Sequence, residues 1–247
     1  PLCSAKKHFD TRILGRHFFF LDICRCVVRK DQYAHRSVFI CLLLLIQNNM
    51  PHPETKYLFF DTETTGIPQD YKAPCTDTDN WPRLVQLGWI LTDSRGNELR
   101  RGNRIVRPEG FEIPTAASDV HGITTERALA EGEPLRDVML AFGADLNESG
   151  WLVGHNIDYD LHVVGTEYYR LGYDHRIMFA RPYVCTMQAT IDFCNIPGKY
   201  GPKWPRLQEL YVRLFGREFD GAHDAMADIS ATKECFFELL RRNVISL

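Results

Sequence analysis

The sequence predicts an α/β domain in which helices flank a mixed β-sheet. Three strand-like segments follow one another between residues 57 and 108, and helical segments alternate with a short strand after residue 133. The composition, with 45% apolar and 25% charged residues among 247, is typical of a globular protein and excludes a fibrous or wholly disordered chain. A chain of this length buries one sizeable core, so we expect one main domain with an appendage.

The first three predicted strands cover residues 57–63, 83–93 and 97–108. The first strand opens with the apolar run YLFF and ends in polar residues. The second and third are joined by the short turn SRGN, and strands joined by so short a turn pair antiparallel. Between the first two strands, the polar and proline-containing insert at residues 69–82 is expected to be a surface loop.

Later residues alternate between helical and strand patterns. A helix predicted over residues 133–148 is followed by a short strand over residues 151–155. Three further helices are predicted over residues 158–172, 206–216 and 224–242, and their ends are marked by glycine or by basic residues.

Two acids, Asp61 and Glu63, end the first predicted strand. Because side chains alternate across a strand, both project from the same face as Phe59, and Phe60 and Thr62 project from the other. Carboxylates at the end of a buried strand are costly unless something positive pairs with them. Two carboxylates about 7 Å apart along the strand can share hard divalent cations. The alternative is an ordinary solvated pair at a strand end.

A second polar stretch, HNIDYD, runs from the short strand into a helix. It places His155 and Asn156 before the helix, and Asp158 and Asp160 on it. Residues two apart on a helix lie about 200° apart, so only one of these acids faces the sheet. The other is a surface charge or an N-terminal cap. The residues alone leave the choice between the two acids open.

A third stretch opens the last predicted helix. Ala225, Ala227 and Ala231 are small enough for close packing on the sheet, and Asp228 lies among them where an apolar residue is expected. His223 precedes Asp228 by five residues. A histidine at a helix start is ordinarily a cap or a surface residue, but near a metal-binding carboxylate cluster it can act as a general base.

Together and in this order, the three stretches resemble the DEDDh (DnaQ-like) branch of the exonuclease superfamily, which includes the proofreading epsilon subunit of bacterial DNA polymerase III. The family motifs are Asp-x-Glu on the first strand, His-Asn-x-x-(Phe/Tyr)-Asp leading into a helix, and His-x-x-x-x-Asp at the last helix. This sequence matches them as DTE, HNIDYD and HDAMAD. The resemblance covers roughly residues 56–242, selects Asp160 over Asp158, and implies a ribonuclease-H-like fold.

The resemblance also implies the chemistry of the site. It implies two divalent metal ions, Mg²⁺ or Mn²⁺, held by Asp61, Glu63, Asp160 and Asp228, with Asp61 bridging both ions. His223 would remove the proton of the attacking water, and these five residues form the expected catalytic set. The implied reaction is hydrolysis of phosphodiester bonds at nucleic-acid 3′ ends, with release of 5′-mononucleotides.

Four more residues are expected to contact the substrate. Thr64, Gly66 and Ile67 match the family's turn after the first motif, where backbone N–H groups meet the terminal nucleotide and the apolar side chain lies against its base. His121, within the family-like segment VHGIT, is expected to contact the same base. The alternatives are core packing for Ile67 and a structural turn at His121.

The first 49 residues differ from the rest of the chain. They carry eight basic and three acidic side chains, a charge of +5, which leaves −8 on the remainder because the net charge is −3. Nucleic-acid contacts of the main domain are therefore expected to be local or metal-bridged. We expect residues 1–49 to be an atypical extension, such as translated upstream sequence before Met50. A membrane-associating segment is the alternative, although the apolar run at 38–46 is too short to span a bilayer.

The exonuclease domain is expected over residues 50–247, with no membrane contact. Eight cysteines without zinc-site spacing predict free thiols in a reducing compartment, which we expect to be the cytoplasm. The expected partner is a nucleic-acid 3′ end, with single-stranded DNA favoured, in proofreading, repair or end trimming. Because no long tail follows the last predicted helix, we expect a free-standing enzyme rather than a polymerase-bound subunit.

Two other functions remain open. One is RNA trimming by an enzyme of the same fold, because the sequence shows no clear reader of the 2′-hydroxyl group. The other is a catalytically inactive module that binds nucleic acid, which loss of a site acid or of His223 would have favoured. All five catalytic positions are filled in this sequence.

Overall fold

The computed structural model describes residues 55–221 and 224–247. Its main feature is a five-stranded sheet with the order β3-β2-β1-β4-β5. β2 runs antiparallel to β1 and β3, whereas β4 runs parallel to β1 and β5, so the predicted mixed sheet is confirmed. The strands are β1 (Tyr57–Thr64), β2 (Leu84–Thr92), β3 (Glu98–Ile105), β4 (Trp151–Gly154) and β5 (Tyr183–Cys185).

β1 is the central strand, and both of its faces are buried. Tyr57 and Phe59 belong to the core on one side of the sheet, and Leu58 and Phe60 belong to the core on the other. A strand covered on both faces needs a continuous apolar run rather than an alternating one, which explains the sequence YLFF. The first polar residues of the strand come only at its far end.

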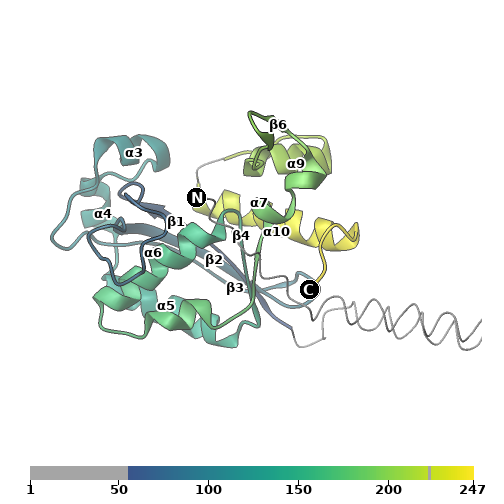
Figure 1. Ribbon diagram of the computed structural model, residues 1–247. Coiled ribbons are helices and arrows are strands. Elements are labelled where there is room, and N and C mark those ends of the chain that lie inside the picture. The colour runs from purple at the N-terminus through teal and green to yellow at the C-terminus, as the bar shows by residue number, and fades with distance from the viewer. Residues whose placement is uncertain (1–54, 222–223) are drawn as a thin grey trace, which may run out of the picture. The chain divides into compact units, whose positions relative to one another are not determined.

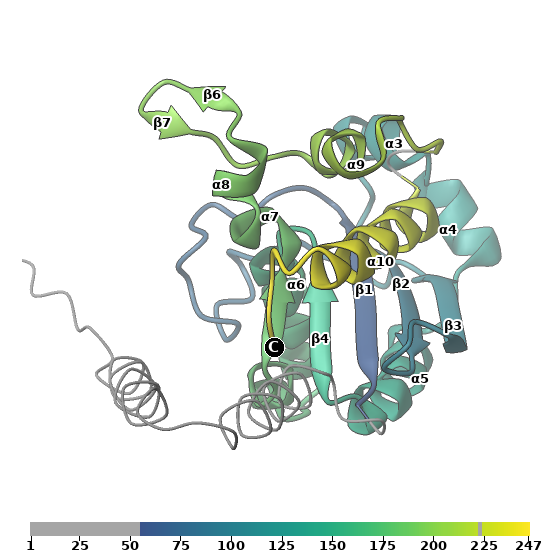
Figure 2. The ribbon, with the colours of Figure 1, turned by 90° about the vertical axis from the view of Figure 1, so that its right-hand side faces the viewer.

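Helices cover both faces of the sheet (Figures 1 and 2). α5 (Leu135–Glu148) and α6 (Ile157–Arg170) lie on one face, and α10 (Ala225–Arg241) lies on the other. α9 (Leu207–Phe215) packs against the outer side of α10. The four helices agree with the predicted ranges to within two residues at each end.

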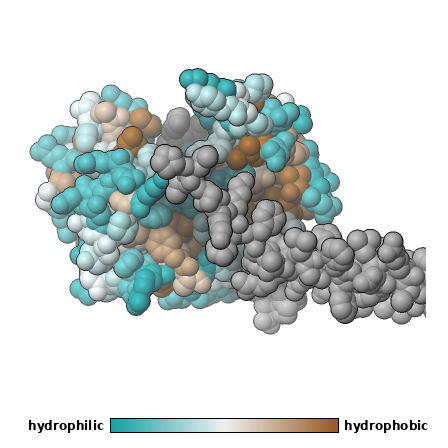
Figure 3. All heavy atoms as spheres, in the orientation of Figure 1, coloured by the Kyte–Doolittle hydropathy of each residue, from teal (hydrophilic) through white to brown (hydrophobic). Residues whose placement is uncertain are grey.

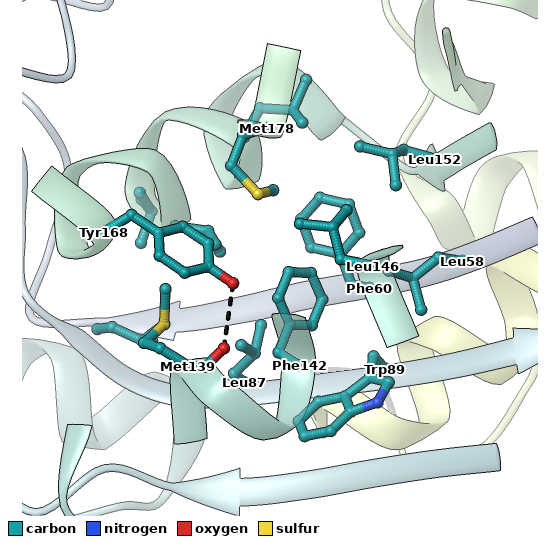
Figure 4. Close-up of a cluster of buried hydrophobic side chains, with 14 of the residues drawn as sticks. Leu58, Phe60, Leu87, Trp89, Met139, Phe142, Leu146, Leu152, Tyr168 and Met178 are labelled. Carbon is teal, nitrogen blue, oxygen red and sulfur yellow. Dashed lines mark hydrogen bonds between the residues drawn. The ribbon is translucent and has the colours of Figure 1, made fainter. Parts of the chain in front are cut away.

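The larger core lies between the sheet and the helices α5 and α6 (Figure 4). Phe142 of α5 contacts Phe60 of β1 and Trp89 of β2, with ring centroids 5.4 Å and 5.7 Å away. The Tyr168 hydroxyl donates a hydrogen bond of 3.1 Å to the Met139 carbonyl, drawn as a dashed line in the figure. This bond lets a buried polar atom enter the core without the cost of an unpaired hydroxyl.

α10 approaches the sheet closely at its first turn. Ala225 is fully buried there, above Gly88 of β2. A Cβ atom at Gly88 would lie 2.6 Å from Cδ1 of Ile229 and 3.3 Å from Cβ of Ala225, so the glycine makes room for the helix. The prediction that three alanines face the sheet is correct only in part, because Ala231 packs toward α9 and Ala227 is half-buried.

The structure also contains short elements that the sequence pattern does not reveal. β5 has three residues, and α3 and α4 have seven each, which is too short for a clear periodicity. α3 matters for the site because it carries His121. These elements are α3 (Thr115–His121), α4 (Thr125–Glu131), η1 (His175–Phe179), α7 (Thr186–Ala189), α8 (Ile191–Cys194), β6 (Pro197–Gly198) and β7 (Gly201–Pro202).

The insert at residues 69–82 is a surface loop, as its polar composition predicts, and three buried side chains anchor it to the domain. It has no helix or strand, but Ala73, Cys75 and Trp81 are 8%, 4% and 3% exposed. The indole N–H of Trp81 donates to the carbonyl of Ala73 at 3.1 Å. Three apolar anchors within a polar segment therefore hold this loop against the domain.

The predicted extension over residues 1–49 lies outside the described residues and stays a prediction. The cysteines at positions 75, 185, 194 and 235 are free thiols. Across residues 55–221 and 224–247, no helix combines the length and the apolar character needed to cross a bilayer. On the face that Figure 3 shows, hydrophilic side chains predominate, and apolar ones gather in separate patches, as on most folded domains.

Candidate active site

The polar end of β1 gathers four of the predicted site acids. Asp61 and Glu63 belong to β1, Asp160 lies in the first turn of α6, and Asp228 lies in the first turn of α10. Burial raises the pKa of the Asp61 carboxyl well above its ordinary value, and the charges of the other three acids raise it further. Three separate segments of the chain therefore converge on one acidic site.

Burial and mutual repulsion dominate the electrostatics of this cluster. Burial raises the pKa of Glu63 to about 8, and the charges of Asp228, Asp160 and Asp224 add to this effect. Burial also raises the pKa of Asp160, which is 3% exposed, although its hydrogen bonds oppose the shift. All of the charges that act on Glu63 here are negative, so the metal-free cluster repels itself.

Thr62 fixes the orientation of Asp160. The Oδ1 atom of Asp160 accepts the backbone N–H of Thr62 at 3.0 Å and its hydroxyl at 2.6 Å. Asp158 points to different partners, because its carboxylate accepts the Tyr183 hydroxyl at 2.9 Å and the Gln188 amide at 2.7 Å. Asp160, and not Asp158, is therefore the acid of this helix that joins the cluster.

The chemistry of the four carboxylates fits divalent cations. Hard cations such as Mg²⁺ and Mn²⁺ prefer oxygen ligands, and a positive ion would relieve the repulsion between the acids. Within the described part of the chain, no three His, Cys, Asp or Glu side chains already form a closed ligand set. Water and substrate oxygens would complete the coordination, as is usual for Mg²⁺.

His223, the predicted general base, lies outside the described residues and stays a prediction. The next residue, Asp224, caps α10 by accepting the N–H groups of Met226 and Ala227, each at 3.0 Å. An N-cap of this kind fixes the start of a helix. It therefore sets the position of Asp228 within the first turn.

The first two residues of the second motif have structural roles. His155 joins two segments, because its Nδ1 pairs with the Thr186 hydroxyl at 3.0 Å and its Nε2 with the Pro205 carbonyl at 2.9 Å. Burial lowers the pKa of His155 to about 4, which keeps the ring neutral near pH 7. Asn156 has a φ of 74°, and this left-handed conformation turns the chain from β4 into α6.

The four predicted substrate-binding residues line one pocket beside the acids. The pocket has a volume of about 430 Å³, and Thr64, Gly66, Ile67 and His121 line it together with Glu63. Ligand sites in proteins typically have volumes of about 300–1,000 Å³, so this pocket is of a suitable size for one nucleotide. The structure thus brings the predicted metal ligands and the predicted substrate contacts to one place.

Ile67 forms an exposed wall of this pocket. Its side chain is 75% exposed, so the alternative of core packing is wrong. Val120 of α3 lines the same pocket and is 58% exposed. Exposed aliphatic side chains inside a pocket offer a flat apolar surface to the face of a base.

Thr64 and His121 shape the pocket through hydrogen bonds. The hydroxyls of Thr64 and Tyr159 both donate to the Gly66 carbonyl, at 2.7 Å and 2.8 Å. The Nδ1 atom of His121 accepts the backbone N–H of Ile123 at 3.1 Å, so the histidine stabilises a turn and lines the pocket at the same time. Burial lowers the pKa of His121 below its ordinary value.

Several pocket residues were not predicted from the sequence. Pro114, Ala117 and Val120 come from α3 and its N-cap, and Tyr71 comes from the loop between β1 and β2. A signal for α3 existed in Gly122, which ends the helix with a φ of 71°. No comparable signal marked Tyr71, because the anchors of its loop are spread over a polar segment.

A comparison with protein families decides the identity of this fold. The model of the exonuclease family RNase_T matches residues 58–236, which is more than half of the chain. The chain belongs to this exonuclease family. The match begins in β1 and ends in α10, so it includes the four acids of the site. The predicted resemblance to DnaQ-like exonucleases is thereby confirmed.

Two relatives of this exonuclease-family chain carry exonuclease names. It is 29% identical over 184 residues to "Uncharacterized exonuclease CP81" of Escherichia phage 186, which covers 72% of this chain and 85% of the relative. It is 26% identical over 202 residues to Three-prime repair exonuclease 1 of Homo sapiens, which covers 73% of this chain and 62% of the relative.

Solved structures share the fold of this exonuclease-family chain. The zinc-bound form of Escherichia coli exonuclease I with single-stranded DNA superposes with a TM-score of 0.62 at 24% identity, and covers 76% of this chain. The same enzyme with a dT13 oligonucleotide gives a TM-score of 0.61. This chain spans about two fifths, 41%, of those exonuclease I chains. The likeness confirms the predicted ribonuclease-H-like α/β fold.

Proposed function

We propose that this protein is a metal-dependent 3′–5′ exonuclease, which hydrolyses the last phosphodiester bond of a nucleic-acid strand and releases a 5′-mononucleotide. The observation that carries the proposal is the cluster of Asp61, Glu63, Asp160 and Asp228 beside a pocket of about 430 Å³. The pocket is of a size to hold one terminal nucleotide, and Glu63 lines it, which supports a role of the acid cluster at the phosphate of that nucleotide.

Asp61, Glu63, Asp160 and Asp228 would hold two Mg²⁺ or Mn²⁺ ions. Bound there, the ions supply positive charge that stabilises the attacking and the leaving oxygen of the displacement. The same charge would lower the raised pKa values of Asp61 and Glu63 and keep both carboxylates ionised near pH 7.

The other steps fall to side chains around the acids. His223 precedes Asp228 by five residues and would accept the proton of the attacking water. Ile67 and Val120 would make apolar contacts with the terminal base, and such contacts do not depend on which base it is. Thr64 and Gly66 would carry the backbone that meets the terminal sugar.

Single-stranded DNA is the proposed substrate. The phage and human relatives are named exonucleases, and the exonuclease I structures contain single-stranded DNA oligonucleotides. The main domain carries an excess of negative charge, which suits contact with a strand end better than contact with a long stretch of backbone.

We also propose that the exonuclease domain begins near residue 50 and that the protein acts in the cytoplasm. The family match starts at residue 58, within the first strand. The free thiols at four described positions suit a reducing compartment.

A paired time course on 5′-labelled single-stranded DNA and RNA of one sequence, with Mn²⁺ or EDTA, tests the proposed activity. We expect a ladder that shortens from the 3′ end on DNA, and only with Mn²⁺. Asp61→Asn should slow it about a thousandfold, because bound metal contributes several kcal/mol and each 1.36 kcal/mol is tenfold. Asp137→Asn is the control, because Asp137 is an exposed acid in the first turn of α5.

Other outcomes have distinct meanings. A ladder mainly on RNA would assign the protein to RNA trimming. Shortening from the 5′ end would contradict the proposed polarity. No shortening of either strand would contradict the proposed activity itself and return the protein to the class of inactive binding modules.

A further inference from the structure

A second pocket adjoins the first. It has a volume of about 680 Å³ and shares Tyr71, Asn156 and Tyr159 with the pocket for the terminal nucleotide. The shared residues form the boundary between the two pockets. A strand whose last nucleotide fills the first pocket can therefore continue directly into the second, which has no role in the chemistry described above.

One wall of the second pocket is the loop between β1 and β2. Its Tyr71 is 56% exposed, and the ring centroid lies 6.5 Å from that of Tyr159. Arg170 of α6 fixes the loop by donating to the carbonyls of Thr78 at 2.6 Å and Trp81 at 2.8 Å. The wall is thus in place before a substrate binds, which avoids the entropic cost of ordering it later.

Another wall carries Trp204, which follows the β6–β7 hairpin and is 60% exposed. The adjacent Pro205 is buried, and its carbonyl accepts a hydrogen bond of 2.9 Å from Nε2 of His155. The chain next to Trp204 is therefore anchored to the end of β4, whereas the indole ring itself remains open to a ligand.

The chemistry of these walls suits a single nucleic-acid strand. Tyr71 and Trp204 present exposed aromatic rings, on which bases stack regardless of their identity. Lys72 lines the same pocket and offers a cation to a phosphate. Asp158 also lies on the wall, but its carboxylate accepts hydrogen bonds from a tyrosine hydroxyl and a glutamine amide, which reduces its repulsion of a phosphate.

We propose that the second pocket binds the nucleotide on the 5′ side of the one that is removed, with its base stacked on Trp204. This inference rests on the proposed function and deepens it. The ligand class is a single-stranded polynucleotide, because the faces of a base inside a duplex are covered by its neighbours. The enzyme would therefore prefer unpaired 3′ ends over paired ones.

Two measurements on one enzyme preparation test this inference. The first is kcat/KM for single-stranded oligothymidylates with Mn²⁺. The second is the inhibition constant of thymidine 5′-monophosphate, which fills the first pocket alone. Trp204→Ala should lower kcat/KM about tenfold to a hundredfold, the usual effect of losing a stacked base, and should change the inhibition constant by less than about twofold. Trp204→Phe should restore most of the loss.

Tyr200→Ala is the matched control. Tyr200 is an aromatic residue in the turn of the β6–β7 hairpin that precedes Trp204, is 91% exposed, and lines neither pocket. Its replacement should leave both constants unchanged, and melting curves check that all variants remain folded. Equal losses for the oligonucleotide and the monophosphate, an unaltered Trp204→Ala enzyme, or an equal loss in Tyr200→Ala would each overturn the inference. Failure of the wild-type protein to shorten any strand would instead overturn the proposed function, and the inference with it.

Discussion

In the metal-free protein, burial and mutual repulsion make the ionised form of Glu63 unfavourable. The carboxyl of Glu63 has a pKa of about 8 in the folded protein, against about 4.3 in an unfolded chain. Between these two values the folded state holds a proton that the unfolded state has lost. Stability of the metal-free protein therefore falls as the pH rises from about 4 through 8. Metal binding competes with the same protons, so affinity for Mn²⁺ rises over this range.

Replacing Glu63 should make the metal-free protein more stable. We expect Glu63→Gln to raise the free energy of unfolding in EDTA by about 1–3 kcal/mol at pH 8.5. It should have little effect at pH 4, where the Glu63 carboxyl of the folded protein is as neutral as the glutamine amide. Urea unfolding at the two pH values measures the difference. Glu112→Gln, at an exposed position, is the control. A destabilised Glu63→Gln variant at pH 8.5 would show that repulsion does not govern this cluster.

Thr62 is expected to act through Asp160. Thr62→Val keeps the size of the side chain but removes the hydroxyl that donates to Asp160 Oδ1 at 2.6 Å. Groups that orient a metal ligand typically affect metal affinity or activity about 10- to 100-fold, so we expect a loss of that size and a higher Mn²⁺ requirement. Titration of activity with Mn²⁺ measures both. Thr62→Ser retains the hydroxyl and should behave as wild type; an unchanged Mn²⁺ midpoint in Thr62→Val would contradict the positioning role.

At the scale of single residues, much of the site was predictable. Alternation along a strand places Asp61 and Glu63 on one face, and helical geometry leaves one acid of the second motif for the sheet side. The choice of Asp160 came only from the family resemblance, because the partners of Asp158 lie 25 and 30 residues away in sequence. The exposure of Ile67 also depends on tertiary structure, and so the sequence alone left its role open.

Among the elements, the loop between β1 and β2 depends on one buried ion network. Glu167 of α6 is fully buried and pairs with Arg83 at 3.0 Å and with Arg170 at 2.8 Å. Arg170 also donates to the Pro82 carbonyl at 3.2 Å. The network links α6 to the loop that forms a wall of the second pocket, so loss of a network residue should loosen this loop.

Arg170→Met should therefore destabilise the protein and release the loop. Loss of one partner from a buried charge network costs about 3–5 kcal/mol, although Arg83 remains to pair with Glu167. Urea unfolding measures the loss, and limited trypsin digestion should show faster cleavage after the exposed Lys72. Arg176→Met removes a solvent-exposed pair with Asp174 and should lower stability far less than Arg170→Met does. Equal stability of the two variants would contradict the importance of burial.

The longer helices and strands were predictable because each is long enough to show its pattern of apolar and polar residues. α5, α6, α9 and α10 show the helical repeat over nine or more residues, and β1 to β4 follow from apolar runs and turns. β5 and α3 were missed because three and seven residues contain too little pattern. The surface loop at residues 69–82 was predicted, but its anchoring was not, because that depends on Arg170, a residue of another element.

Across the whole molecule, the sheet divides the core into two parts. Apolar side chains of β1 enter both parts, so this strand is fixed from two faces and hydrogen-bonded to two neighbours, β2 and β4. The site acids come from this strand and from the first turns of two helices on opposite faces (Figure 1). The fold therefore places two of the four site acids on a strand whose apolar part is buried on both faces.

Amide hydrogen exchange should reveal this arrangement as a gradient. Backbone N–H groups of Leu58 to Asp61 are expected to exchange only through global unfolding. The first-turn N–H groups of α6 and α10 lack acceptors within their own helices and should exchange faster. Mass spectrometry or NMR in EDTA measures the order, and equal rates in the strand and the two first turns would contradict it.

The central position of β1 also determines how the site can lose its metal ions. We expect local opening to move the starts of α6 and α10 more than Asp61 and Glu63, because these two residues are paired with β2. Asp61 and Glu63 thus keep the position that β1 gives them, whereas the positions of Asp160 and Asp228 depend on the starts of α6 and α10. Loss of metal through local opening would be reversible, because the starts of both helices can pack again on the intact strand.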